Sequence, residues 1–278
     1  MPYLAQIFLY PIKSLDGIAV PQATILPSGA LQGDREFAIV DQQGRVINGK
    51  RTAAIHHIRA SFDLAARTVS LRREGTEQQE CFHLDTERSH LETWLSDDFG
   101  FAVHLIQNPE MGFPDDTDSP GPTLISTATL ETVTHWFPEL TLGNVRQRFR
   151  TNLEIADTIA FWEDQLFGQA GTAVSFHIGD VQFDGINPCQ RCIVPTRDPI
   201  TGSPSTDFQK VFTRQRQATL PDWAESTRFN HFYRLAINTR LPRSQAGKTL
   251  KVNDPINRSE QSAVSRTQAP GVESNRSD

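Results

Sequence analysis

The amino-acid sequence predicts an α+β protein that is mainly β and is built from two barrel-like or sandwich-like halves. Short segments in which apolar and polar residues alternate recur along most of the chain, whereas few segments show helical spacing. A stretch rich in Pro, Gly and Asp at residues 108–122 separates the halves and is expected to be a linker or a mobile loop. We therefore expect one domain at residues 1–122 and a second at residues 123–256.

The first half is expected to consist mostly of strands. Residues 1–15 are apolar but lack the positive region and the cleavage site of a signal peptide, so they predict a first strand. Residues 37–48 alternate around a turn that ends in Gly44, which predicts a β-hairpin. Residues 62–64 and 69–71 predict two more strands, again around a polar turn.

Three segments predict helices. Residues 85–100 carry apolar side chains at helical spacing and end in a glycine that suits a helix C-terminus. Residues 124–138 predict a helix that Ser126 or Thr127 can cap and that the closing proline stops. A third helix is predicted around residues 210–217.

The remaining strands are predicted at residues 101–107, 148–156, 173–178 and 181–186, with a last strand pair at residues 231–241 and 248–256. Residues 257–278 have no aromatic side chain and are mostly polar, so we expect a disordered tail.

Composition excludes several classes of protein. The net charge of −6 and the pI near 5.8 give no sign of bulk attraction to nucleic acid, although a local basic pocket is compatible with them. No apolar stretch reaches the ~20 residues that a membrane span needs. Three cysteines are too few for a secreted disulfide framework and favour a reducing compartment, so we expect a cytoplasmic protein that binds neither nucleic acid nor membrane.

Two of the cysteines form a C-x-x-C at Cys189 and Cys192, within INPCQRCIVPTRDPITG. A structural zinc site would need about four ligands, and the sequence has neither a second C-x-x-C nor an H-x-x-x-H pair. A thioredoxin-type redox pair would start a helix, which Pro195 and Pro199 disfavour. A plain buried thiol pair is the ordinary alternative. The remaining interpretation is a thiolate ligand to a cofactor metal, kept ionised by nearby cations such as Arg191.

The segment Pro188–Gly202, P-C-x-R-C followed by T-x-D-P-x-T-G, resembles the signature of the MOSC domain, which is similar to the C-terminal part of molybdenum cofactor sulfurases. Three further stretches resemble this family in kind and order. The first is Tyr10–Ser14 with Gly33–Arg35, which resemble the Y-P-[IV]-K-S and G-D-R pattern of the β-barrel domain that precedes MOSC. The second is Leu124–Thr127, which resembles the opening of the linking helix. The third is Arg148–Asn152, which resembles the family's R-F-R-x-N segment. Thr151 departs from the family's usual proline in the last of these.

The resemblance implies an N-terminal MOSC-type β-barrel domain followed by a MOSC β-barrel domain. Chains with this layout resemble the amidoxime-reducing component and its bacterial homologues, which use molybdenum cofactor (Mo-molybdopterin) to reduce N-hydroxylated compounds. It implies that Cys192 is the molybdenum ligand and, with Asp198, a catalytic residue. The implied cofactor-binding residues are Lys13, Ser14, Arg35, Ser126, Thr127, Arg148, Arg150, Asn152, Cys189 and Arg191.

These residue types suit an anionic cofactor, because guanidinium forks match phosphate and pterin edges and an amide offers both a donor and an acceptor. Each has an ordinary alternative. Arg148 and Arg150 would share one solvated face of a strand, Lys13 and Ser14 could form a simple turn, and Cys189 could be the ligand in place of its neighbour.

The expected partners are a small N-hydroxylated substrate and a separate electron-donor protein, such as a ferredoxin, a flavodoxin or a cytochrome b5-like protein. A plant-type iron–sulfur cluster needs four cysteines, and the chain has three. A cofactor carrier without turnover of its own is the main alternative. Sulfur transfer is a weaker one, because it would need a pyridoxal phosphate domain for which 278 residues leave no room.

Overall fold

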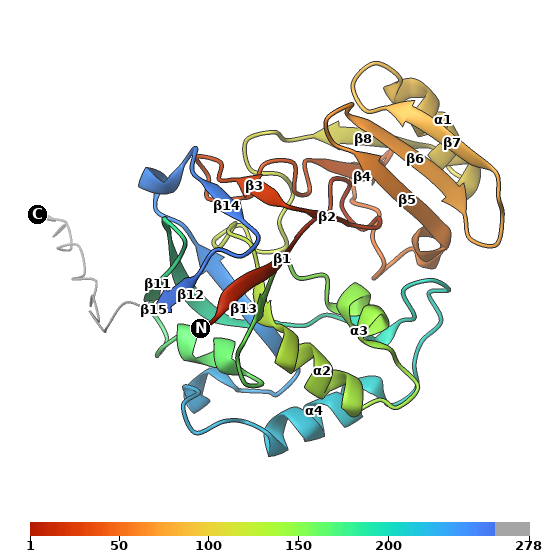
Figure 1. The fold of residues 1–278 in the computed structure, drawn as a ribbon. Coiled ribbons are helices and arrows are strands. Elements are labelled where there is room, and N and C mark those ends of the chain that lie inside the picture. The colour runs from red at the N-terminus through yellow and green to blue at the C-terminus, as the bar shows by residue number, and fades with distance from the viewer. Residues whose placement is uncertain (259–278) are drawn as a thin grey trace, which may run out of the picture.

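The computed structural model describes residues 1–258 and confirms an α+β fold that is mainly β (Figure 1). The strands are β1 (Tyr3–Leu9), β2 (Ile18–Val20), β3 (Gln22–Thr24), β4 (Phe37–Asp41), β5 (Ile58–Asp63), β6 (Thr68–Arg73), β7 (Gln79–His83), β8 (Val103–Gln107), β9 (Leu124–Ser126), β10 (Leu153–Ala156), β11 (Val174–Ile178), β12 (Val181–Gln190), β13 (Arg234–Arg240), β14 (Thr249–Lys251) and β15 (Ile256–Arg258). The α-helices are α1 (Arg88–Phe99), α2 (Thr127–His135), α3 (Leu142–Phe149) and α4 (Phe208–Ala218).

The main sheet has eight strands in the order β15-β11-β12-β13-β9-β10-β1-β2. β9 and β10 are parallel, and the other pairs in the sheet are antiparallel. β1 comes from the first half of the sequence, yet it pairs with β10 of the second half, and β3 likewise pairs with β14. The Pro- and Gly-rich stretch at residues 108–122 therefore does not divide the sheets of the two halves.

A second group of strands lies at one end of the molecule, in the upper right of Figure 1. It comprises the sheet β5-β6-β7 and the pair β4-β8, and α1 packs on β8. The predicted strands around residues 62–71 are confirmed as β5 and β6. The predicted hairpin at residues 37–48 is only partly correct, because β4 pairs with β8 and meets the residues after its turn at one bridge, Val40 with Val46.

Helix signals were accurate for α1, α2 and α4. Gly100 ends α1 in a left-handed conformation with φ 74°, which a residue without a Cβ adopts at little cost. The Ser126 side chain accepts a hydrogen bond from the backbone N–H of Thr129 and caps α2. The predicted segment 210–217 lies inside α4.

The predicted strand at residues 148–156 is wrong over its first part. Residues up to Phe149 belong to α3, and β10 begins only at Leu153. The Thr141 side chain caps α3 by accepting from the Asn144 N–H at 3.2 Å, and Val145 and Phe149 share its buried face. This cap and this four-residue spacing outweigh the short Arg-Phe-Arg alternation that suggested a strand.

The three helices of the second half pack through aromatic rings. Phe137 after α2 stacks on Phe208 of α4 with 4.4 Å between ring centroids, and Phe149 of α3 lies 5.6 Å from Phe212. This cluster fixes α3 against the sheet. The last turn of α3 and the residues after it therefore have a fixed position beside β1 and β12.

Two further predictions change at the C-terminal side. The last strand pair does not form, because β13 pairs with β12 and β9 whereas β14 pairs with β3. Asn257 and Arg258 belong to β15, not to a disordered tail, and the rest of that predicted tail lies outside the described residues. Within residues 1–258, no helix combines the length and the apolar character that crossing a bilayer requires.

Candidate functional site

A cavity of about 990 Å³ lies where segments from both halves of the chain meet. Its walls come from the loop after β1, the segment 111–121, the end of α3 with the residues that follow, and the end of β12 with the turn beyond it. Residues 48–50 and 55–59 contribute from the smaller sheets. Of the residues predicted for the site, those lining the cavity are Lys13, Ser14, Arg35, Arg148, Arg150, Asn152, Cys189, Arg191 and Cys192.

The cavity wall is strongly basic although the whole chain has a net charge of −6. Eleven lysines and arginines line it against four aspartates. The basic residues are Lys13, Arg35, Lys50, Arg59, Arg146, Arg148, Arg150, Arg191, Arg197, Arg228 and Arg234, and the acidic ones are Asp16, Asp34, Asp115 and Asp116. A concave basic wall of this kind concentrates anionic ligands.

Several of these arginines point at carbonyl oxygens and have no acidic partner. Arg150 donates to the Leu15 carbonyl at 2.6 Å, and Arg191 donates to the Phe149 carbonyl. Arg197 donates to the Gly202 carbonyl at 3.1 Å. None of the three forms an ion pair with another residue in the described part of the chain. Their orientation is therefore set while their charge stays available to a ligand.

The two cysteines of the C-x-x-C occupy different environments. Cys189 lies in β12, is buried, and donates its thiol hydrogen to Oδ1 of Asn238 at 2.8 Å. Burial raises the pKa of Cys189 to about 11, although the nearby Arg191 acts in the opposite direction. Cys192 follows the end of the strand and is exposed on the cavity wall. Of these two cysteines, only Cys192 therefore offers an accessible sulfur.

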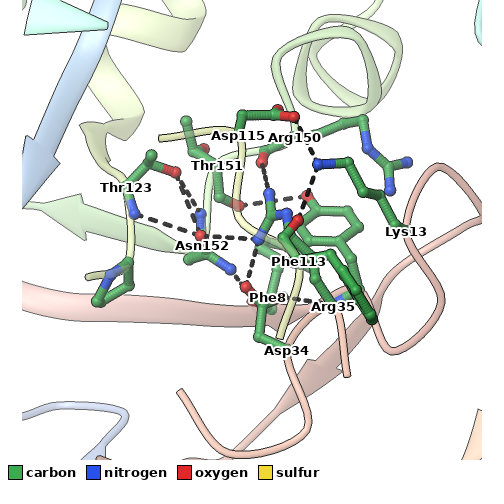
Figure 2. A network of polar contacts seen from close by, with 12 residues as sticks. Phe8, Lys13, Asp34, Arg35, Phe113, Asp115, Thr123, Arg150, Thr151 and Asn152 are labelled. Atoms are coloured by element: carbon green, nitrogen blue, oxygen red, sulfur yellow. Dashed lines mark hydrogen bonds and ion pairs between the residues drawn. The ribbon is translucent and has the colours of Figure 1, made fainter. Parts of the chain in front are cut away.

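A polar network ties the two halves together beside the cavity, and Asn152 lies at its centre (Figure 2). Its Nδ2 donates to the Phe8 carbonyl at 3.0 Å, and its Oδ1 accepts from Nη1 of Arg35 and from the Thr123 N–H and hydroxyl, each at 3.3 Å. Arg35 also pairs with Asp34, whose other carboxylate oxygen accepts from the Tyr10 N–H at 2.9 Å. The site is thus held in shape by bonds between segments distant in sequence.

Lys13 connects the loop after β1 to the segment 111–121. Its ammonium group donates to the Phe113 carbonyl and to the Asp115 carboxylate, each at 2.8 Å, as Figure 2 shows. Ser119, in the same segment, is buried. The stretch that the sequence predicts as a linker or mobile loop therefore forms part of the cavity wall.

Two of the arginines make cation–π contacts with the ring of Tyr10. The guanidinium carbon of Arg150 lies 4.2 Å from the centre of the Tyr10 ring, and that of Arg35 lies 5.1 Å from it. Burial raises the pKa of Tyr10 despite these cations, so the phenol remains neutral. Ser14, Arg35 and Arg150 all have positive φ, of 75°, 50° and 51°. Such strained backbone is typical of functional sites.

Asp198, predicted as catalytic, does not line the cavity. Its Oδ1 accepts from the Ile200 and Thr201 N–H groups at 3.0 and 2.8 Å, which organises the turn after the C-x-x-C. Its Oδ2 lies 3.9 Å from Nη2 of Arg148. Arg148 is buried and donates to the Pro195 carbonyl at 2.8 Å. Asp198 therefore acts on the site through Arg148 and the turn.

Ser126 and Thr127, predicted to bind cofactor, also lie away from the cavity wall. Ser126 is the fully buried cap of α2. The Thr127 hydroxyl donates to Glu154 at 2.9 Å, and Glu154 is paired with Arg146. The structure assigns these two residues to the anchoring of α2 and α3.

Sequence reasoning missed the contribution of the smaller sheets to the cavity. His56 and Arg59 line it, and Nη2 of Arg59 donates to the Pro199 carbonyl at 3.3 Å. His56 lies in the 3-10 helix Ala53–His57, and burial lowers its pKa. Among residues 1–258, no group of three or more His, Cys, Asp or Glu side chains is arranged to hold a metal ion.

Comparison with known proteins identifies both parts of the chain. Residues 1–101 match the model of the MOSC N-terminal beta barrel domain, and residues 123–257 match that of the MOSC domain. Two relatives are molybdenum cofactor sulfurases of Drosophila grimshawi and Bos taurus, 26% identical over 244 residues and 24% identical over 265 residues. Each alignment covers 77% of this chain, but the chain spans only 30% and 29% of the two relatives.

Among solved structures, the YuaD protein from Bacillus subtilis is similar with a TM-score of 0.37 and 10% identity, covering 92% of this chain and 94% of that one. The two domain models together account for most of the described residues, and they meet at the cavity that carries Cys192. The chain therefore belongs to the MOSC-domain proteins that carry an N-terminal MOSC β-barrel domain.

Proposed function

We propose that this protein binds molybdenum cofactor in the basic cavity, with Cys192 as the protein ligand to molybdenum, and that it reduces N-hydroxylated compounds with electrons from a separate donor protein. The observation that carries the proposal is the accessible thiol of Cys192 on a wall with eleven basic and four acidic residues. The sulfurase relatives support a link to this cofactor.

The residues present fit the cofactor. Molybdenum favours soft thiolate ligands, and the cofactor brings its own dithiolene sulfurs, so one protein thiolate is sufficient. Its phosphate is anionic, and its pterin is rich in hydrogen-bonding groups. Arg150 and Arg191 would hold them, because both guanidinium groups are oriented by carbonyl oxygens and lack an acidic partner among the described residues.

The protein's part in the reaction is to bind and to orient the cofactor and the substrate. When bound, the cofactor supplies two-electron chemistry with oxygen-atom transfer. Reduction of a hydroxylamine consumes two electrons and two protons and yields an amine and one water. The neutral Cys189, which donates to Asn238 at 2.8 Å, would keep the end of β12 packed and so fix the position of Cys192.

A second candidate is a cofactor carrier without turnover. The curated relatives act on the cofactor according to their names, and this chain matches only about three tenths of their length. A cavity that binds the cofactor would serve either function.

One experiment separates these functions. The protein is expressed in a host that makes the cofactor, and bound molybdenum and molybdopterin are measured together with reduction of benzamidoxime by reduced methyl viologen. Bound cofactor with turnover supports the reductase, and bound cofactor without turnover supports the carrier. Absence of molybdopterin from the purified protein contradicts both. Cys81→Ser is the matched control for cysteine variants, because Cys81 is exposed on β7 and does not line the cavity.

A further inference from the structure

Two guanidinium groups on the cavity wall are not among the residues assigned to the cofactor. Arg234 begins β13 and pairs across the sheet with Gln190 of β12, and Arg228 ends the 3-10 helix Ser226–Arg228. Both line the cavity. They lie close enough for the charge of Arg228 to lower the pKa of Arg234, after the larger effect of burial.

Neutral acceptors hold both side chains in place. Arg234 donates from Nη1 to the Pro188 carbonyl at 3.0 Å and from Nη2 to Oδ1 of Asn230 at 2.8 Å. Arg228 donates from Nη1 to the carbonyls of Gly168 and Gln169 at 2.9 and 3.2 Å. These bonds orient the guanidinium groups without neutralising them.

Nearby acids compensate the two charges only weakly. Neither arginine forms an ion pair with a residue in the range 1–258. Glu225, the acid next to Arg228 in the chain, raises the pKa of Arg228, but by less than burial lowers it, and its carboxylate accepts from the Thr227 N–H and hydroxyl at 3.2 and 2.7 Å and not from Arg228. The sulfur of Cys189 also interacts with Arg234, but its pKa of about 11 keeps it a neutral thiol. Burial lowers the pKa of Arg228 as well. Two half-buried cations without an ion-pair contact are unfavourable, and an anionic ligand would relieve that cost.

We propose that Arg228 and Arg234 form an anion subsite that binds a carboxylate or phosphate group of the substrate. The inference rests on the proposed function and makes it more specific, because it makes the preferred substrates anionic N-hydroxylated compounds. Arg234 is anchored to Pro188, and Cys192 lies four positions further along the same segment. A substrate held by its anionic group at this end of the cavity thus binds beside the thiol-bearing turn.

The first test measures binding without turnover. Calorimetric titration compares 4-carboxybenzamidoxime with benzamidoxime on the wild-type protein, Arg228→Gln and Arg234→Gln. Arg240→Gln is the matched control, because Arg240 lies on the same strand and also donates to a carbonyl, that of Asp118 at 3.0 Å, but does not line the cavity. We expect the wild type to bind the carboxylate at least about tenfold more tightly than the neutral compound, and each cavity variant to lose most of that preference.

The second test decides which anion uses the subsite. Molybdopterin content is measured in the same variants, and it should be unchanged. A loss of molybdopterin in Arg234→Gln would assign the subsite to the phosphate of the cofactor and overturn the proposal. Equal wild-type affinity for the two compounds would also overturn it, even if both Gln variants proved too unstable to purify. Arg234→Lys should retain part of the preference.

Failure of the proposed function has a different pattern. The wild type could bind 4-carboxybenzamidoxime more tightly than the two Gln variants do and yet reduce neither compound. That result would support the anion subsite and contradict the reductase assignment. Turnover of both compounds with the same KM would retain the reductase and reject the subsite.

Discussion

The thiol of Cys189 donates a hydrogen bond to Oδ1 of Asn238 across the β12–β13 pair, with 2.8 Å between sulfur and oxygen. The bond joins the strand that ends in the C-x-x-C to the strand at the centre of the main sheet. The two cysteines differ in exposure, because Cys189 is buried although it lines the cavity, whereas Cys192 is exposed on the cavity wall.

Iodoacetamide should therefore label Cys192 and spare Cys189 in the folded protein without cofactor. Cys189 becomes a thiolate only as the pH approaches its raised pKa of about 11, and it is buried as well. Trypsin cuts after Arg191 and places the two cysteines on different peptides, so mass spectrometry reads each separately. Denatured protein, in which both should react, is the control. Equal labelling of the two at pH 8 would show that the burial of Cys189 is not maintained in solution.

The buried carboxyl of Glu163 should make the protein less stable as the pH rises from acid to neutral. Burial, with a further contribution from Asp164, raises the pKa of Glu163 from 4.5 to about 7. A raised pKa contributes stability that is complete below pH 4.5 and is lost as the pH rises through about 7. The loss is about 3 kcal/mol in the free energy of unfolding.

Glu163→Gln should remove this part of the pH dependence. The amide keeps an acceptor for the Thr129 hydroxyl, which donates to Glu163 at 3.1 Å, and it cannot ionise. Urea unfolding at pH 5 and pH 8 measures the effect. A variant whose stability changes between these pH values as much as that of the wild type would contradict the assignment.

Arg216→Ala should destabilise the fold by about 3–5 kcal/mol, because it leaves Asp164 buried without its cation. Arg216 is 1% exposed, pairs with Asp164, and lies between the rings of Phe161 and Phe229 at 4.3 and 4.9 Å. Arg214→Ala, at an exposed position of the same helix, is the control and should change the unfolding free energy by less than about 0.5 kcal/mol. Similar effects of the two substitutions would contradict the role given to the pair.

Turnover should require a separate electron carrier. The 278-residue chain has three cysteines, and a plant-type iron–sulfur cluster needs four. The purified cofactor-loaded protein with benzamidoxime and NADPH alone should be inactive, and a reductase with ferredoxin, flavodoxin or a cytochrome b5-like protein should start turnover. Activity with NADPH alone, in protein free of flavoprotein, would refute a separate donor.

The sequence was sufficient to predict those helices whose ends depend on a residue at the end of the helix itself. Gly100 ends α1 and Ser126 caps α2, and both effects depend on residues within one helical turn. The α3 helix was missed because it has only eight residues, and its cap, Thr141, follows a proline-containing turn. Local sequence patterns also could not predict that β4 pairs with β8, because β8 begins more than 60 residues further along the chain.

The candidate site was predictable in its residue types but not in its geometry. The net charge of −6 does not indicate that the cavity wall carries eleven basic and four acidic residues, because the basic residues come together only in the folded chain. Nothing local to Tyr10 indicates that Arg150, 140 positions away, stacks on its ring. Ser126, Thr127 and Asp198 belong to the sequence motifs, but Ser126 caps α2, Thr127 donates to Glu154, and Asp198 organises a turn.

The most direct test of the account is the molybdenum and molybdopterin content of the wild type, Cys192→Ser, Cys189→Ser and the Cys81→Ser control, all purified from a cofactor-competent host. Cys192→Ser should lose the metal, because a serine oxygen is a harder and poorer ligand than a thiolate. Cys189→Ser and Cys81→Ser should retain most of it, since Cys189 is buried and its sulfur is engaged by Asn238 whereas Cys81 lies outside the cavity. Metal retained in Cys192→Ser and lost in Cys189→Ser would contradict the assignment of the ligand, and a wild type without molybdopterin would contradict the account as a whole.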